Sequence, residues 1–168
     1  NGCLISFDPN LRLSLWKTPE EARKRILYGM KQCDIMKISE EEVAFVSEQE
    51  SLEEGVSFIR DNSDIKILFV TLGSKGSIAY YKDEKIYCRG IHQEHVVDTT
   101  GAGDTFCGAV LSRILELGTD ALTVEDIREM LLFANTAASI VVTRKGALCS
   151  MPEPEEIRAA SSLIDKVL

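Results

Sequence analysis

Residues 98–108 read DTTGAGDTFCG, a glycine-rich turn that leads directly into a helical pattern. The small residues at 101–103 allow a ligand to approach the backbone closely. From Asp104 onward, apolar side chains recur at helical spacing until Gly118, which ends the predicted helix. The N–H groups of a first helical turn and the positive end of the helix dipole favour a phosphate. The stretch therefore predicts an anion-binding turn with a carboxylate beside it, the arrangement that phosphoryl transfer requires.

The same stretch carries a family resemblance. A GxGD sequence alone would indicate only the start of a helix, because short glycine motifs recur by chance. The whole of residues 98–108, however, resembles the C-terminal signature of the ribokinase-like (PfkB) sugar kinases, and it is neither a Walker A loop nor a Rossmann GxGxxG motif. The resemblance covers essentially the entire chain and is nearest to the bacterial fructokinases. It implies a ribokinase-like three-layer α/β/α sandwich with a mostly parallel sheet.

The resemblance assigns catalytic roles to residues of the signature. Asp104 would be the base that takes the proton of the sugar hydroxyl. The backbone N–H groups of Gly101, Ala102 and Gly103 would hold the charge that builds on the transferring phosphoryl group.

Composition excludes several other classes of protein. The chain has 168 residues, 45% of them hydrophobic and 27% charged, which is ordinary for one globular domain. Its net charge of −8 argues against binding to nucleic acid or to an anionic membrane, although one local site can still bind ATP. No apolar run approaches the roughly 20 residues of a membrane span. The five cysteines are scattered without a CxxC pair, which disfavours a disulfide framework or zinc site and favours a cytoplasmic location.

Strand patterns alternate with helix patterns along the chain, which predicts an α/β fold with a mostly parallel sheet. The strands at 77–81 and 85–88 are expected to form an antiparallel hairpin. The expected strands are 3–7, 34–38, 67–72, 77–81, 85–88 and 95–97. The expected helices cover residues 19–32, 52–62, 124–142 and 154–167, with one more that begins after Ser39 and another that runs from the signature to residue 117. Hydroxyl capping motifs precede four of these helices, at Thr18, Ser39, Ser51 and Thr123.

Four segments with candidate functional residues each follow a predicted strand. They are residues 8–12, 39–42, 71–76 and 98–104. Because parallel sheets bind ligands beyond the carboxyl ends of their strands, we expect these segments at one edge of the sheet.

Residues 8–16 read DPNLRLSLW and resemble the DPNxRxxLW segment of fructokinases and related sugar-acid kinases. The segment could be a simple turn, an interpretation we favour for Pro9 and for Trp16, which would then pack in the core. For Arg12 a second interpretation stays open, in which its planar guanidinium binds a phosphate or a substrate carboxylate.

Residues 39–42 read SEEE, which is a helix cap by its spacing. In the resembled family this position holds an Asn-x-x-Glu motif whose glutamate helps to organise magnesium and phosphates. Ser39 replaces the asparagine here, so the resemblance assigns a role near Mg²⁺ only to Glu42. The two roles are compatible.

The nucleotide site is expected at residues 71–76, which read TLGSKG. By itself this hexapeptide indicates an ordinary strand-to-hairpin turn. Asn135 lies in an alanine-rich helix although asparagine is a poor helix former, so it either faces solvent or has a specific role. The resemblance places ATP against Thr71, Leu72, Gly73, Ser74, Lys75, Gly76, Gly103, Asp104 and Asn135.

Residues 141–150 resemble the loop that encloses a monovalent cation in ribokinase. Ligation by oxygen atoms alone suits a hard ion such as K⁺. Arg144 also has a simpler interpretation, since a positive charge is favourable at a helix end. The implied ligands are the side chains of Asp98 and Ser150 and the carbonyl groups of Thr100, Val141, Arg144 and Gly146.

Together these features imply an ATP- and Mg²⁺-dependent kinase that phosphorylates a primary hydroxyl of a ketose, with fructose as the expected substrate. Two alternatives stay open. One is a 2-keto-3-deoxygluconate kinase, in which Arg12 would hold a carboxylate, and the other is a nucleotide-binding module without catalysis. Family members are about twice as long, so residues 1–168 are expected to be the C-terminal, nucleotide-binding part of a kinase, with little activity alone. The full-length protein is expected to be a homodimer.

Overall fold

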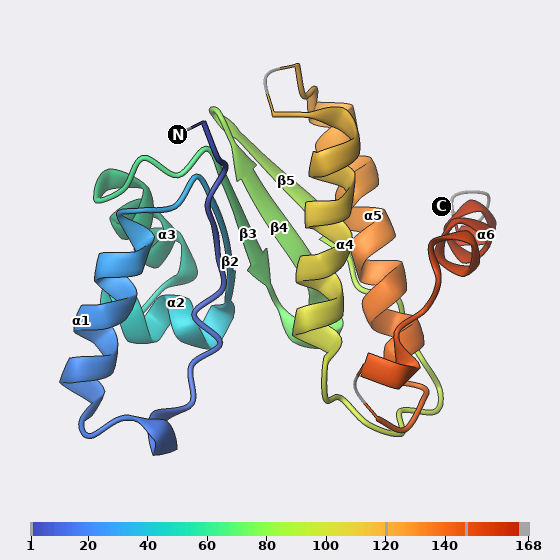
Figure 1. The fold of residues 1–168 in the computed structure, drawn as a ribbon, viewed down its shortest axis with the longest axis horizontal. Helices are drawn as coiled ribbons and strands as arrows, with labels where there is room; N and C mark the ends of the chain where they lie inside the picture. Colours follow the sequence, from blue (N-terminus) through green and yellow to red (C-terminus); the bar gives the residue numbers. More distant parts are fainter. Residues whose placement is uncertain (1, 120, 147, 165–168) are drawn as a thin grey trace. The chain divides into compact units, whose positions relative to one another are not determined.

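The computed structural model describes residues 2–119, 121–146 and 148–164 (Figure 1). The chain divides into two compact units. The first contains the residues up to Leu72 together with Ala79–Asp83, and the second contains Gly73–Ile78 and the residues from Glu84 onward.

Three parallel strands form the centre of the first unit. They are β1 (Ser6–Phe7), β2 (Ile35–Ser39) and β3 (Ile67–Thr71). Ile35 pairs with Ile67 and Ser39 with Thr71, so β2 and β3 end at the same level. Both strands are buried except at their last residue, as expected for apolar runs in a parallel sheet. The predictions for 34–38 and 67–72 are confirmed to within one residue.

Three helices complete the first unit, and Figure 1 shows them in blue to teal beside these strands. They are α1 (Pro19–Met30), α2 (Glu40–Ser47) and α3 (Leu52–Asp61). Each begins after a hydroxyl residue whose side chain accepts a hydrogen bond from the N–H three residues later, which satisfies one of the unpaired amides of the first turn. Only the α2 cap is reciprocal, because the Glu42 side chain also accepts from the Ser39 N–H. In α3, the Ser51 hydroxyl instead donates to the Glu54 carboxylate at 2.8 Å.

The first strand differs from its prediction as a buried strand over 3–7. Only Ser6 and Phe7 form β1, and Leu4 and Ile5 are 44% and 49% exposed. Among the described residues β1 lies at one end of the strand order and pairs only with β2. Apolar composition does not show how many neighbours a strand has, and β1, as an edge strand, is paired on one side only.

The second unit is built around two long helices, α4 (Ala102–Leu117) and α5 (Val124–Val141), which lie side by side in yellow and orange in Figure 1. A further helix, α6 (Pro154–Ile164), packs against α5. Most positions of the apolar stripes predicted for α4 and α5 are buried, with Phe106, Ile114 and Leu131 no more than 2% exposed. Leu117 and Val124, at the outer ends of the two stripes, are 41% and 37% exposed, so the prediction is wrong there. The helix predicted for 154–167 is confirmed as far as Ile164, and its last residues lie outside the described part.

The predicted hairpin is formed by β4 (Gly76–Tyr81) and β5 (Glu84–Arg89). A connection of only two residues, with Lys82 at φ 54°, requires antiparallel neighbours. The strand order of the sheet is β1-β2-β3-β4-β5, so the sheet is mixed and the predicted α/β class is confirmed. Within the described residues no helix is both long enough and apolar enough to cross a bilayer.

The strand predicted for 95–97 is absent, and this prediction is wrong. Val96 and Val97 are more than half exposed. The Val97 and Asp98 N–H groups instead donate to the Val142 carbonyl at 2.8 and 3.2 Å. The segment before the signature is thus attached to the end of α5, and residues 98–104 do not follow a strand.

Candidate functional site

The signature turn begins helix α4 through the backbone conformation of one glycine. Gly101 is the N-cap of α4 at φ 83°, in the left-handed region that glycine tolerates best. Its carbonyl accepts the Thr105 N–H at 2.8 Å, while the Ala102 N–H donates to Thr99 at 3.2 Å. The Ala102 amide is therefore engaged within the turn. Gly103 occupies a first-turn position for which an α-helix provides no carbonyl partner.

The candidate base, Asp104, lies in the first turn of α4 and is exposed. The next two residues, Thr105 and Phe106, are 7% and 2% exposed. Asp104 therefore lies at the surface in the first turn of a helix whose following residues are buried.

The predicted cation loop is organised around Asp98 and Gly146. One Asp98 oxygen, Oδ1, accepts the Thr100 N–H at 2.9 Å, and Oδ2 accepts the Gly146 N–H at 3.4 Å. The Ser150 hydroxyl donates to the Gly146 carbonyl at 2.6 Å. Hydrogen bonds from the side chain and then the amide of Thr100 lower the pKa of Asp98, with a smaller contribution from Gly146. The structure thus links Asp98, Gly146 and Ser150 of the predicted set.

Two other members of the set are Val141, the last residue of α5, and Arg144 in the segment that follows it. The Val141 carbonyl accepts the Arg144 N–H at 3.1 Å. The Arg144 guanidinium donates to the Ser150 carbonyl at 3.4 Å and forms an ion pair with Glu156 of α6. Arg144 therefore braces this loop, and the oxygen-only set suits a hard cation.

The nucleotide loop predicted for 71–76 spans both units. Thr71 ends β3 opposite Ser39 in the first unit, and Leu72 is the last residue of that segment. In the second unit, Gly73–Lys75 form a 3₁₀ turn that leads into Gly76.

Residues 73–76 are held closely against the end of β5. A Cβ atom on Gly76 would lie 2.2 Å from the Cys88 carbonyl oxygen, and one on Gly90 would lie 2.2 Å from the Ser74 oxygen. The Lys75 carbonyl accepts both the Tyr87 hydroxyl at 2.7 Å and the Gly90 N–H at 2.9 Å. The loop is therefore fixed by backbone contacts that only glycine permits.

Asn135 is buried, with 7% of the residue exposed. Its Nδ2 donates to the carbonyl groups of Cys88 at 3.2 Å and Arg89 at 3.3 Å, and its Oδ1 accepts the Ser77 hydroxyl at 3.0 Å. The asparagine therefore ties α5 to both strands of the hairpin beside residues 73–76. The interpretation that it faces solvent is wrong, and its contact with a nucleotide stays a prediction.

A group of charged residues at the ends of β1 and β2 was not predicted as a cluster. Lys37 Nζ lies 3.2 Å from Asp8 Oδ2, with the lysine side chain only 8% exposed. Burial raises the pKa of Asp8, and the nearby ammonium of Lys37 opposes that rise. Glu42 accepts the Leu11 N–H on Oε1 at 2.6 Å and the Ser39 N–H on Oε2 at 2.9 Å. The available signal was a lysine within the apolar strand sequence IMKIS.

Arg12 follows this group and is exposed. Its Nη1 donates to the Leu11 carbonyl at 3.0 Å. Trp16 is only half-buried, so its expected place in the core is wrong; it follows a 3₁₀ turn, Leu13–Leu15, that contains no buried residue.

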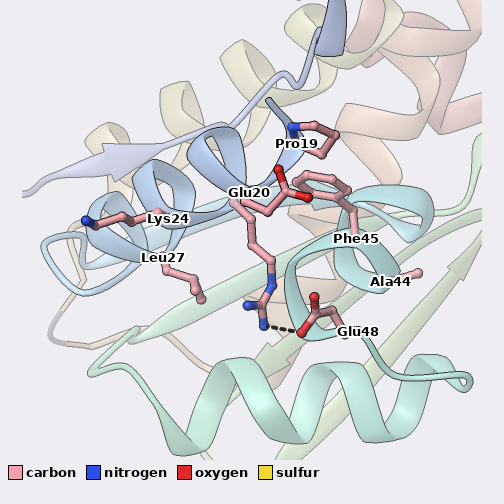
Figure 2. A pocket seen from close by; sticks show the side chains of 8 residues that line it. Pro19, Glu20, Lys24, Leu27, Ala44, Phe45 and Glu48 are labelled. Atoms are coloured by element: carbon pink, nitrogen blue, oxygen red, sulfur yellow. Dashed lines mark ion pairs between the residues drawn. The ribbon is translucent and has the colours of Figure 1, made fainter. Parts of the chain in front are cut away.

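A hollow of about 550 Å³ lies beside α1 and α2 (Figure 2). Arg23, one of its lining residues, forms an ion pair with Glu48 at 3.1 Å and donates to the Val46 carbonyl at 2.8 Å. The hollow contains none of the predicted site residues. Its lining consists of Pro19, Glu20, Arg23, Lys24, Leu27, Ala44, Phe45 and Glu48.

Residues 1–154 match the pfkB family carbohydrate kinase family, and the chain belongs to that family. Fructokinase-1 of Oryza sativa subsp. japonica is 40% identical over 159 residues, which cover 93% of this chain and 48% of the relative. The solved structure of a fructokinase double mutant from Vibrio cholerae O395, in its fructose, ADP and potassium ion bound form, is 33% identical in sequence and has a TM-score of 0.84. The match covers 93% of this chain and 49% of the Vibrio chain. The solved structure of fructokinase from Xylella fastidiosa with bound ATP is 25% identical in sequence and has a TM-score of 0.87. That match covers 98% of this chain and 53% of the Xylella chain. The chain thus spans about half the length of each of these three relatives.

Proposed function

We propose that these residues are the C-terminal, nucleotide-binding part of an ATP-dependent fructokinase. Family membership and the fructokinase names of the relatives support the reaction class. The observation that carries the proposal is the exposed Asp104 carboxylate in the first turn of α4, directly after the left-handed Gly101. A base must be accessible to the hydroxyl that it deprotonates.

In the proposed reaction, Asp104 accepts the proton of the sugar hydroxyl as the hydroxyl oxygen forms a bond to the γ-phosphorus of ATP. The bond from that phosphorus to the oxygen bridging the β- and γ-phosphates breaks, and ADP leaves with the electron pair. The Gly103 N–H stabilises the charge on the transferring group together with the Gly101 and Ala102 amides. Ala102 would first have to release the Thr99 carbonyl, so Gly103 is the better donor in this structure.

We further propose that ATP is lined by Gly73, Ser74, Lys75 and Gly76 in the second unit. The tight backbone contacts of Gly76 and Gly90 support a preorganised loop, which lowers the entropy lost on binding. Asn135 supports the same loop through its three hydrogen bonds.

Two cations are part of the proposal. Mg²⁺ would neutralise phosphate charge during transfer. Glu42 fits a water-mediated role toward it, because each carboxylate oxygen already accepts one backbone N–H and retains a further lone pair. The oxygen atoms of Asp98, Ser150, Thr100, Val141, Arg144 and Gly146 fit K⁺ better, since carboxylate, hydroxyl and carbonyl oxygens suit a hard ion.

Arg12 bears on the choice between a sugar and a sugar acid, because it is exposed and its guanidinium can bind either an ATP phosphate or a substrate carboxylate. We propose fructose because the relatives in the plant and in the two bacteria are fructokinases. A homodimeric, cytoplasmic enzyme is part of the same proposal; scattered free cysteines support the compartment.

The test compares two acceptors in the full-length protein that carries these residues. We expect ATP-dependent phosphorylation of fructose with a much higher kcat/KM than that of 2-keto-3-deoxygluconate. A preference for the sugar acid would assign Arg12 to a substrate carboxylate and overturn the fructokinase proposal. ATP binding without phosphorylation of either sugar would identify a non-catalytic nucleotide-binding module.

A further inference from the structure

The segment from Asp8 to Arg12 is held by two separate tethers from β2 and α2. The first is the Lys37–Asp8 ion pair at 3.2 Å. The second is the hydrogen bond from the Leu11 N–H to Glu42 Oε1 at 2.6 Å. Both join residues about thirty positions apart in sequence, so they connect the segment after β1 to β2 and to the first turn of α2.

The backbone between the tethers is also fixed. Asp8 Oδ1 accepts the Asn10 N–H at 3.2 Å, which forms a local turn closed by the side chain. Asn10 has φ 43°, a left-handed conformation that asparagine tolerates better than most residues. Asp8 thus uses one oxygen for Lys37 and the other for the turn, and Leu11 is secured immediately afterward.

The charged side chains that form these two tethers are largely buried. Only 8% of the Lys37 side chain and 16% of the Asp8 side chain are exposed, and Glu42 is 8% exposed as a residue. A buried ammonium or carboxylate is costly when its partner is removed, because the remaining charge has lost its hydration. The arrangement of these charges therefore strongly favours one conformation of residues 8–11.

We infer that Lys37, Asp8 and Glu42 are positioning residues that present the Arg12 guanidinium to an anionic group of a substrate. Arg12 is the first residue beyond the fixed turn, is exposed, and has its Nη1 on the Leu11 carbonyl at 3.0 Å. A preorganised guanidinium loses less conformational entropy when it binds a carboxylate or phosphate. In this arrangement Glu42 acts on the Leu11 backbone rather than directly on the ligand. The role of Arg12 as an anion contact rests on the proposed function, whereas the tethers do not.

The first arm of the test follows the Leu11 amide of this chain by NMR hydrogen exchange. The variant Glu42→Gln keeps one terminal oxygen and replaces the other by an amide nitrogen, so the Leu11 and Ser39 N–H groups no longer each have a charged oxygen to donate to. We expect Leu11 exchange to become about tenfold faster or more, as loss of a charge-assisted hydrogen bond implies. The matched control, Glu41→Gln, changes the adjacent exposed residue and leaves the exchange unchanged.

Lys37→Met provides an independent variant on the other tether. Here too the Asn10 and Leu11 amides should exchange faster while the amides of β2 and β3 keep their protection. Unchanged exchange at Leu11 in both variants would overturn the inference. A rise shared by the amides of β2 and β3 would also overturn it, because that result shows a general loss of stability instead of a local release.

The second arm is a double-mutant cycle in the full-length kinase. Arg12→Ala and Lys37→Met should each raise the KM of the substrate whose anionic group Arg12 binds, with a smaller change in kcat. In the Arg12→Ala background, Lys37→Met should have no further effect, because its influence passes through Arg12. Additive effects would overturn the positioning role. A wild-type protein that phosphorylates no sugar would contradict the proposed function, while the exchange arm would still decide whether the tethers exist.

Discussion

The left-handed conformation of Gly101 sets the geometry of the signature turn. It allows the Gly101 carbonyl to accept the Thr105 N–H and so begins α4. The helix then buries Phe106 and leaves Asp104 exposed. One backbone conformation therefore determines both where the helix starts and which side chain is accessible.

Replacing Gly101 by alanine tests this conformation. At φ 83° the backbone is left-handed, and a residue with a Cβ atom is strained in that conformation. We therefore expect Gly101→Ala to lower the free energy of unfolding by about 1–2 kcal/mol. The matched control is Gly108→Ala within α4, where a Cβ atom meets nothing within 4 Å. That change should be neutral or stabilise by up to about 1 kcal/mol, because alanine is the better helix former. Urea unfolding of both variants measures the difference; equal effects would contradict the assignment of a strained position.

Cysteine chemistry gives a second test of local environment. Burial raises the pKa of the Cys33 thiol to about 11. Only about one thiol in a thousand is then ionised at pH 8, so alkylation should be slow, since the thiolate is the nucleophile. Cys3 and Cys149 are exposed and should be modified first by iodoacetamide, as peptide mass spectrometry can show. Modification of Cys33 at the rate of Cys3 in the folded chain would contradict its burial.

Helix α5 supports the loops of the second unit along its whole length. Its N-terminus is closed by a reciprocal cap between Thr123 and Asp126. Asn135, near its middle, holds the hairpin, and the Val142 carbonyl at its end holds the segment before the signature. A weaker α5 should therefore disturb the nucleotide loop and the signature together.

The cap of α5 predicts a pH dependence of stability. Hydrogen bonds from the side chain and amide of Thr123 lower the pKa of Asp126 below its ordinary value of 3.8. A lowered folded-state pKa means that the ionised carboxylate stabilises the fold above 3.8, and that this contribution is lost as pH falls through the folded value. At neutral pH the wild type should be more stable than Asp126→Asn, and the difference should shrink in acid. Thermal unfolding across this range measures it; a difference that grows in acid would contradict the cap.

Local signals explain which elements could be predicted from sequence. The starts of α1, α2, α3 and α5 follow hydroxyl caps, whose hydrogen bonds span three residues and are therefore visible in the sequence. The segments 3–7 and 95–97 were predicted poorly, because a strand requires a neighbour that composition does not reveal. The same limit applies to the site, since Lys37 reaches Asp8 across 29 positions and Asn135 reaches Ser77 across 58.

The two units carry different parts of the family's motifs. The first contains Arg12 and Glu42, and the second contains the signature, the cation loop and Asn135. The chain spans about half the length of its relatives, 48% in the rice fructokinase. We therefore expect the sugar selectivity of the proposed enzyme to depend on residues beyond those described, whereas the acid–base chemistry should depend on Asp104.

The turnover of an Asp104→Asn variant shows whether this carboxylate is the catalytic base. In the full-length protein, phosphoryl transfer from ATP to fructose should fall by about 10²–10⁴-fold, because the asparagine cannot accept the hydroxyl proton. ATP affinity, measured by calorimetry, should stay close to that of the wild type, and the control Glu129→Gln on the exposed side of α5 should retain full turnover. Near-normal turnover in Asp104→Asn would contradict the account, as would a loss of ATP binding large enough to explain the lost activity.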